Sequence, residues 1–198
     1  MLYKFNEELL YQKIDGLSLL HKIAFGASCC ERLLPNYKLF VDKEDWGDFS
    51  YLEDTLNELW NYVSGKQIEL NRIEILSKEC YKLTPDSEDF GSVFVSYAID
   101  AGVAIYETLL CCLDNEAQHL VDIASVSRDA VDLFIQERDH MNYSDFDFEK
   151  KILSDSLMQK ELHKQLIDLE MLKNKPQLDL QFIKEFRSIV KGTSNTRS

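Results

Sequence analysis

The sequence predicts an all-α protein, a bundle of about eight helices around one central and mostly apolar helix over residues 92–113. Glycine and proline together account for 10 of the 198 residues, fewer than the roughly 12% of average usage, so the tight turns that short strands need are scarce. Apolar residues recur with the helical period of about 3.6 in nearly every segment. The expected helices cover residues 5–14, 17–34, 50–63, 68–82, 92–113, 115–137, 144–172 and 174–192.

The first two helices have recognisable ends. Gly16 ends the first helix, and the second begins at Leu17. Pro35 bends or ends the second helix, because proline lacks the backbone N–H that a helix uses and its ring clashes with the preceding turn. A short helix or turn then follows to Phe40.

Capping and breaking residues bound the third and fourth helices. Ser50 with Glu53 three residues later forms a capping box. The helix that it starts continues to Val63 and ends at Gly65. Pro85 lies just beyond the fourth helix and prevents its continuation.

The fifth expected helix, over residues 92–113, is apolar on almost all sides. Its length of about 33 Å would span a bilayer. However, it contains Asp100 and Glu107 and has no flanking lysine or arginine, which argues against insertion. We therefore expect it to be the buried central helix of the bundle.

Capping residues also mark the last three helices. The sixth starts at Asn115, and Ser144 with Asp147 caps a long seventh helix to about Leu172. Pro176 opens the eighth helix, because proline is favoured in a first helical turn.

No internal repeat or flexible linker interrupts the chain, so we expect one helical domain over residues 1–192 and a disordered tail over residues 193–198. The seventh helix is amphipathic, and its leucines either pack inside the chain or form the seam of a homodimer. These leucines are Leu153, Leu157, Leu162, Leu166 and Leu169.

The negative charge is concentrated in the middle of the chain. The formal net charge is −13, and residues 83–149 alone hold 15 acidic residues against two arginines. Such a surface repels nucleic acid and anionic membranes. It favours a basic protein partner or a cation, although the charge of an acidic protein also serves solubility alone.

The N-terminus lacks a basic segment followed by an apolar one, so we expect a cytosolic protein. The five cysteines occur as two adjacent pairs and a single Cys80. They show neither a disulfide framework nor zinc spacing. We expect reduced cysteines in the core, with one member of each adjacent pair buried and the other not.

No motif indicates catalysis or a cofactor. Two E-x-x-H pairs, at Glu116 with His119 and at Glu137 with His140, resemble half-sites of di-iron proteins. Both pairs lie on one expected helix about 31 Å apart, so they cannot share a metal pair. Phosphate-binding glycine loops and nucleophile elbows are absent from the sequence. We therefore expect no metal and no cofactor.

Four charged residues form the candidate site: Glu31, Arg32, Asp100 and Glu107. Asp100 and Glu107 share one face of the central helix, about 10.5 Å apart along its axis. Buried carboxylates need compensation, and Arg32 and Arg128 are the candidate partners. The four residues form either a polar pocket that binds a ligand or cation, or a set of structural ion pairs.

Five segments carry a family resemblance. They are residues 30–37 (CERLLPNY), 46–48 (WGD), 59–60 (LW), 85–90 (PDSEDF) and 98–104 (AIDAGVA), the last together with Glu107. Their order and spacing resemble the YjaG-like family, domain-of-unknown-function family 416, over about residues 20–120. Where that family tends to have cysteine after Asp-Ala, this chain has Gly102. The resemblance implies a bacterial, cytosolic, all-helical protein with no established activity.

The sequence therefore favours a non-enzymatic protein that works as an adaptor or as an inhibitor of the immunity-protein kind. Its acidic surface over residues 83–149 would face a basic protein partner. The alternative is a small-ligand or cation-binding protein, or an enzyme, that uses the four charged residues. The two hypotheses differ in whether those carboxylates line a cavity open to solvent or are enclosed in ion pairs.

Overall fold

The computed structural model describes residues 2–192, which form nine α-helices and one short 3-10 helix without any strand. This confirms the all-α fold class. The elements are α1 (Glu7–Asp15), α2 (Leu19–Glu44), α3 (Phe49–Val63), α4 (Leu70–Lys82), η1 (Ser87–Asp89), α5 (Phe94–Asp114), α6 (Gln118–Arg138), α7 (Phe148–Ser154), α8 (Ser156–Lys173) and α9 (Leu180–Gly192).

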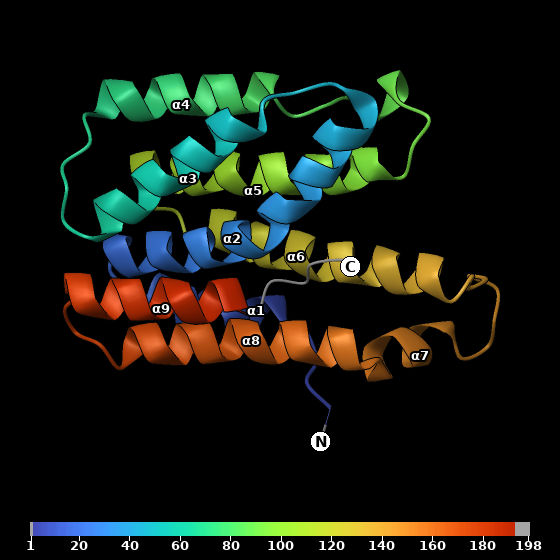
Figure 1. Cartoon of the computed structure of the whole chain (residues 1–198). Coiled ribbons are helices and arrows are strands. Elements are labelled where there is room, and N and C mark those ends of the chain that lie inside the picture. Colours follow the sequence, from blue (N-terminus) through green and yellow to red (C-terminus); the bar gives the residue numbers. More distant parts are fainter. Residues whose placement is uncertain (1, 193–198) are drawn as a thin grey trace.

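The long helices lie in layers, from α4 at the top of Figure 1 to α8 at the bottom. The central pair is α2 and α5, which pack against each other more extensively than any other two helices. Helix α4 covers α5, while α6 contacts both central helices and is itself covered by α8. Helices α3 and α9 pack on α2. The expected central helix over residues 92–113 is therefore α5, and α2 lies beside it at the centre of the bundle.

Helix α2 is buried along most of its length because its neighbours cover nearly every side. Gly26 permits a close approach to α5, since a Cβ atom at this position would lie 2.7 Å from Oγ1 of Thr108. Large side chains such as Phe25, Tyr37 and Phe40 are fully enclosed. This burial is the main stabilising contribution from the helix.

Helix α2 continues through Pro35 and changes direction along its length (Figure 1). Pro35 has no N–H to donate to the carbonyl of Glu31, one turn earlier, so the helix bends there. The helix ends at Glu44, and Asp45, which follows it, has a left-handed φ of 52° and donates its N–H to the carbonyl of Val41. Of the two outcomes expected at Pro35, the structure shows the bend.

Several helix starts differ from the expected ones, among them α6, which begins at Gln118, and α7, which begins at Phe148. The expected seventh helix is divided into α7 and α8, because Asp155 is extended and caps α8 by accepting a hydrogen bond from the Leu157 N–H. Helix α3 is capped by Asp48 rather than Ser50. Helix α9 begins at Leu180, capped by Asp179, rather than directly after the proline.

One large core joins most of the helices, and a small second cluster fixes α7 and the start of α8 against the end of α6. Helix α5 is also the single helix within residues 2–192 that is long and apolar enough to cross a membrane, and more than half of its most apolar stretch is buried in the chain. The tail predicted over residues 193–198 lies outside the described residues.

Candidate functional site

Two antiparallel helices bring a row of carboxylates to one side of the bundle. Asp100, Glu107 and Asp114 recur every seven residues on α5, so they share a face of that helix. Asp122 and Asp129 have the same spacing on α6, and Asp129 is close enough to Asp100 to influence its pKa. We call these five residues the α5–α6 acidic face.

One end of the acidic face is fixed by His119 at the start of α6. Its Nδ1 lies 2.5 Å from a carboxylate oxygen of Glu107, and its Nε2 lies 2.9 Å from one of Asp114. Burial opposes the charged imidazole, but the hydrogen bonds to both carboxylates raise the pKa of His119. A protonated His119 donates both bonds, so Glu107 is compensated locally.

Asp100 has no such compensation. No hydrogen bond or ion pair joins its carboxylate to another residue of the described chain, and the side chain is partly buried. Burial, together with the negative charge of Asp129, raises its pKa from 3.8 to about 7. Arg128, a predicted partner, instead pairs with Asp129 at 2.6 Å and lies over the ring of Phe5.

Arg32 is the centre of a buried ion-pair network between α2 and α8. Its guanidinium donates two hydrogen bonds to Glu161, at 3.1 and 2.9 Å, and a third to Asp168 at 3.1 Å. It also donates to the carbonyl of Ser28 at 3.0 Å. The three charged side chains are at most 4% exposed. Against the effect of burial, the two carboxylates raise the pKa of Arg32.

Further side chains of α8 balance this network. Lys164 forms an ion pair with Asp168, one turn away on the same helix. Gln165 donates to Glu161 and to the carbonyl of Ala124 on α6, each at 3.0 Å. Two cations therefore face two carboxylates inside the bundle, as the stability of buried charge requires.

Glu31, the neighbour of Arg32, points to a different set of partners on α3 and α9. It accepts a hydrogen bond from the indole N–H of Trp60 at 2.7 Å and one from Arg187 at 2.9 Å. Lys191 lies 3.3 Å from its second oxygen. The guanidinium of Arg187 also lies 5.5 Å from the centre of the Trp60 ring. Glu31 thereby joins α2 to α3 and α9.

The structure does not bring the four predicted site residues into one cluster. No hydrogen bond or ion pair within residues 2–192 connects Asp100 or Glu107 to Glu31 or Arg32. Glu31 and Arg32 lie in two separate ion-pair groups, and the two α5 carboxylates lie on the acidic face. The sequence left two alternatives, a polar pocket or structural ion pairs. Glu31, Arg32 and Glu107 form ion pairs, whereas Asp100 forms none within residues 2–192.

The charged residues of α8 and α9 that complete these networks were not predicted from the sequence. Glu161, Lys164 and Asp168 share one helix face at spacings of three, four and seven residues. On an isolated helix this pattern is typical of a solvent-exposed charged face. In the structure these charged residues lie on the buried side of α8. Leu162 and Leu169, two of the leucines considered for a homodimer seam, are also buried within the chain.

The five cysteines are free and buried, both members of each adjacent pair included. The expectation that one member of each pair is exposed was wrong, because α2 and α5 are covered on more than one side. Burial raises the pKa of Cys29 to about 11 and that of Cys80 to about 12. These thiols are therefore protonated at neutral pH, which makes them poor nucleophiles.

The fold and these contacts define a helical-bundle protein with charges paired across its interior. The chain belongs to the family described as "Protein of unknown function (DUF416)", whose model matches residues 9–196. This confirms the resemblance seen in the sequence.

Relatives of the chain are described only as uncharacterised proteins. One, from Haemophilus influenzae, is 25% identical over 190 residues, which are 94% of each chain. Another is YjaG of Escherichia coli, 29% identical over 119 residues, or 60% of each chain. The crystal structure of a DUF416 family protein from Shewanella baltica matches with a TM-score of 0.81 at 24% identity, covering 96% of this chain and 95% of that one. That likeness shows the shared fold.

Proposed function

We propose that the protein is a cytosolic, non-enzymatic binding protein whose α5–α6 acidic face holds a basic protein partner. The observation that carries this proposal is Asp100, a partly buried carboxylate next to Asp129 that forms no ion pair with the described residues. A lysine or arginine of a partner would supply the missing charge. The gain is larger than at an ordinary surface carboxylate, because a partly buried charge is less screened by water.

The surroundings of Asp100 favour an amphipathic basic segment as the partner's contact. Ile99, Val103 and Val126 are partly exposed next to the carboxylates. Apolar side chains of the partner would cover them while its basic side chains meet the acidic face. The net charge of −13 would also speed the encounter with a basic protein. An adaptor or an inhibitor acts by such capture.

The ion pairing of Glu31 and Arg32 also supports binding over catalysis. Arg32 and its two carboxylates are almost completely buried, and Glu31 is 9% exposed. Neither residue lines the surface pockets on α1, α3, α4, α5 or α8. Groups that are already paired and enclosed stabilise the bundle, and a substrate would have to break those pairs to reach them.

Capture from an extract of the source cell tests this proposal. The wild type is compared with the double variant Asp100→Asn/Asp129→Asn and with the control Glu53→Gln/Glu74→Gln, which removes two exposed charges from α3 and α4. We expect the wild type and the control to retain the same basic protein at low salt and to release it at higher salt. The Asp100 and Asp129 variant should not retain it.

Two results would contradict the proposal. If the control loses the partner as completely as the acidic-face variant, general acidity rather than this face is responsible. If the variant at Asp100 and Asp129 retains the partner unchanged, the partner binds elsewhere. Mass spectrometry identifies the retained protein, and its isoelectric point shows whether it is basic.

A further inference from the structure

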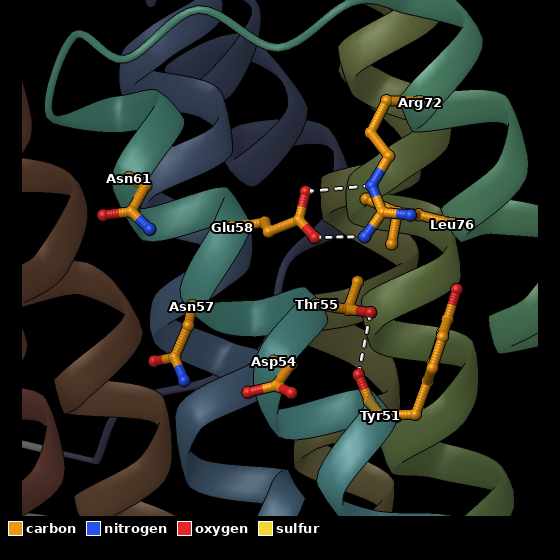
Figure 2. A pocket seen from close by; sticks show the side chains of 8 residues that line it. All are labelled: Tyr51, Asp54, Thr55, Asn57, Glu58, Asn61, Arg72 and Leu76. Atoms are coloured by element: carbon orange, nitrogen blue, oxygen red, sulfur yellow. Dashed lines mark hydrogen bonds and ion pairs between the residues drawn. The ribbon is translucent and has the colours of Figure 1, made fainter.

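A polar pocket between α3 and α4 is separate from the acidic face and from the buried networks. Its volume is about 350 Å³, within the range of small-molecule sites. Figure 2 shows the side chains that line it. They are Tyr51, Asp54, Thr55, Asn57, Glu58, Asn61, Arg72 and Leu76.

Among the described residues that line the pocket, Arg72 is the one cation, and it is already neutralised. Arg72 of α4 makes a two-point ion pair with Glu58 of α3, drawn as two dashed lines in Figure 2. Asp54 is left as the second carboxylate of the lining, and no hydrogen bond or ion pair connects it to another described residue. The lining therefore has a net charge of −1, which favours a cationic ligand over an anionic one.

Neutral polar groups complete the lining. The side-chain amide of Asn61 and the hydroxyl of Tyr51 make no hydrogen bond with the described part of the chain. Asn57 uses its carbonyl oxygen to accept from Arg187 at 2.7 Å, which leaves its NH₂ group to donate. These groups can pair with hydroxyl or carbonyl groups of a ligand, because each offers a donor or an acceptor.

We propose that this pocket binds a small, hydroxylated ligand that carries an ammonium group, such as an amino sugar or amino alcohol. The ammonium pairs with Asp54, and the ligand's hydroxyl groups bond the amides of Asn57 and Asn61. The Tyr51 ring forms one side of the pocket. Charge-assisted hydrogen bonds of this kind are the stronger ones in proteins, so Asp54 supplies most of the specificity.

Asn57 also connects the pocket to the ion pairs of Glu31. The amide that lines the pocket bonds Arg187, which in turn bonds Glu31 and lies over the ring of Trp60. A ligand that engages Asn57 therefore alters the surroundings of the Trp60 indole. This gives the binding event a fluorescence signal that does not depend on any activity.

Isothermal titration calorimetry with matched pairs of probes tests the inference. Glucosamine is compared with glucose, and 1,4-diaminobutane with 1,4-butanediol, so that the members of each pair differ in their amino groups. We expect saturable binding of glucosamine and none of glucose. Binding of the diamine with equal or higher affinity would show that the ammonium alone is recognised, which would overturn the hydroxyl contacts with the amides.

Asp54→Asn and Glu53→Gln form the matched variant and control, since both remove one exposed carboxylate from neighbouring positions of α3. Asp54→Asn should weaken glucosamine binding about tenfold or more, as the loss of a charge-assisted hydrogen bond implies. Glu53→Gln should change it less than about twofold. In a Trp46→Phe background, binding should change the Trp60 fluorescence.

The inference fails if the wild type binds no amine probe saturably, if glucose binds as well as glucosamine, or if the two variants behave alike. It is independent of the proposed protein partner. The variant with Asp100→Asn and Asp129→Asn should bind glucosamine like the wild type, so each proposal can fail without the other.

Discussion

Replacing Arg32 with alanine should destabilise the protein by about 3–5 kcal/mol, the usual cost of removing one partner from a buried ion pair. Lys164 would still pair with Asp168. Glu161, which is 2% exposed, would keep only the amide of Gln165 as a side-chain partner. An uncompensated buried carboxylate accounts for the size of the expected effect. Urea denaturation followed by circular dichroism measures it.

Lys38→Ala is the matched control for this prediction. Lys38 lies on the same helix and also loses a carboxylate partner, Asp42, but both side chains of that pair are more than half exposed. Its removal should cost less than about 1 kcal/mol. Similar losses for the Arg32 and Lys38 variants would show that the α2–α8 network does not hold the bundle together.

Asp100→Asn should stabilise the protein at pH 8 and have little effect near pH 4. In the folded protein the pKa of Asp100 is about 7, whereas a free aspartate has a value of about 3.9. Below pH 4 the carboxyl is protonated in both states. Between pH 4 and pH 7 the carboxyl is ionised in the unfolded state but largely protonated in the folded state, so the free energy of unfolding of the wild type falls as the pH rises. Above pH 7 this loss stays constant. The difference between the two pKa values corresponds to a loss of at most about 4 kcal/mol in the free energy of unfolding.

Thermal unfolding of the wild type and Asp100→Asn across pH 4–8 checks this prediction. Asp129→Asn serves as a comparison, because it removes the repulsion but leaves Asp100 buried. Asp129→Asn should also stabilise the protein, but by less than Asp100→Asn does. A stability difference between the wild type and Asp100→Asn that does not change with pH would show that Asp100 has an ordinary pKa.

Local sequence signals were sufficient for the helices and the fold class. The period of the apolar residues, together with Gly16, Gly65 and Pro85, set most helix boundaries within a few residues. The division of the expected seventh helix was missed because Asp155 is a helix cap only when its context fixes an extended backbone. Arg138 supplies part of that context through an ion pair at 2.8 Å.

The site was harder to predict, because ion pairs between helices depend on which faces meet. Spacing indicated that Asp100 and Glu107 share a face of one helix. It could not show that Arg32 meets Glu161, 129 positions away in the sequence. Nor could it show that Asp54 and Arg72, on different helices, line one pocket.

We propose that Asp100 is an uncompensated carboxylate that a basic partner neutralises. Carbon-13 NMR titration of the Asp100 side-chain carboxyl measures this directly, first in the free protein and then with a lysine-rich amphipathic peptide. We predict a pKa near 7 in the free protein and a lower value with the peptide bound, since a nearby cation favours the ionised carboxyl. A pKa near 4 in the free protein, or one that a bound peptide leaves unchanged, would show that Asp100 is not a carboxylate that a basic partner neutralises.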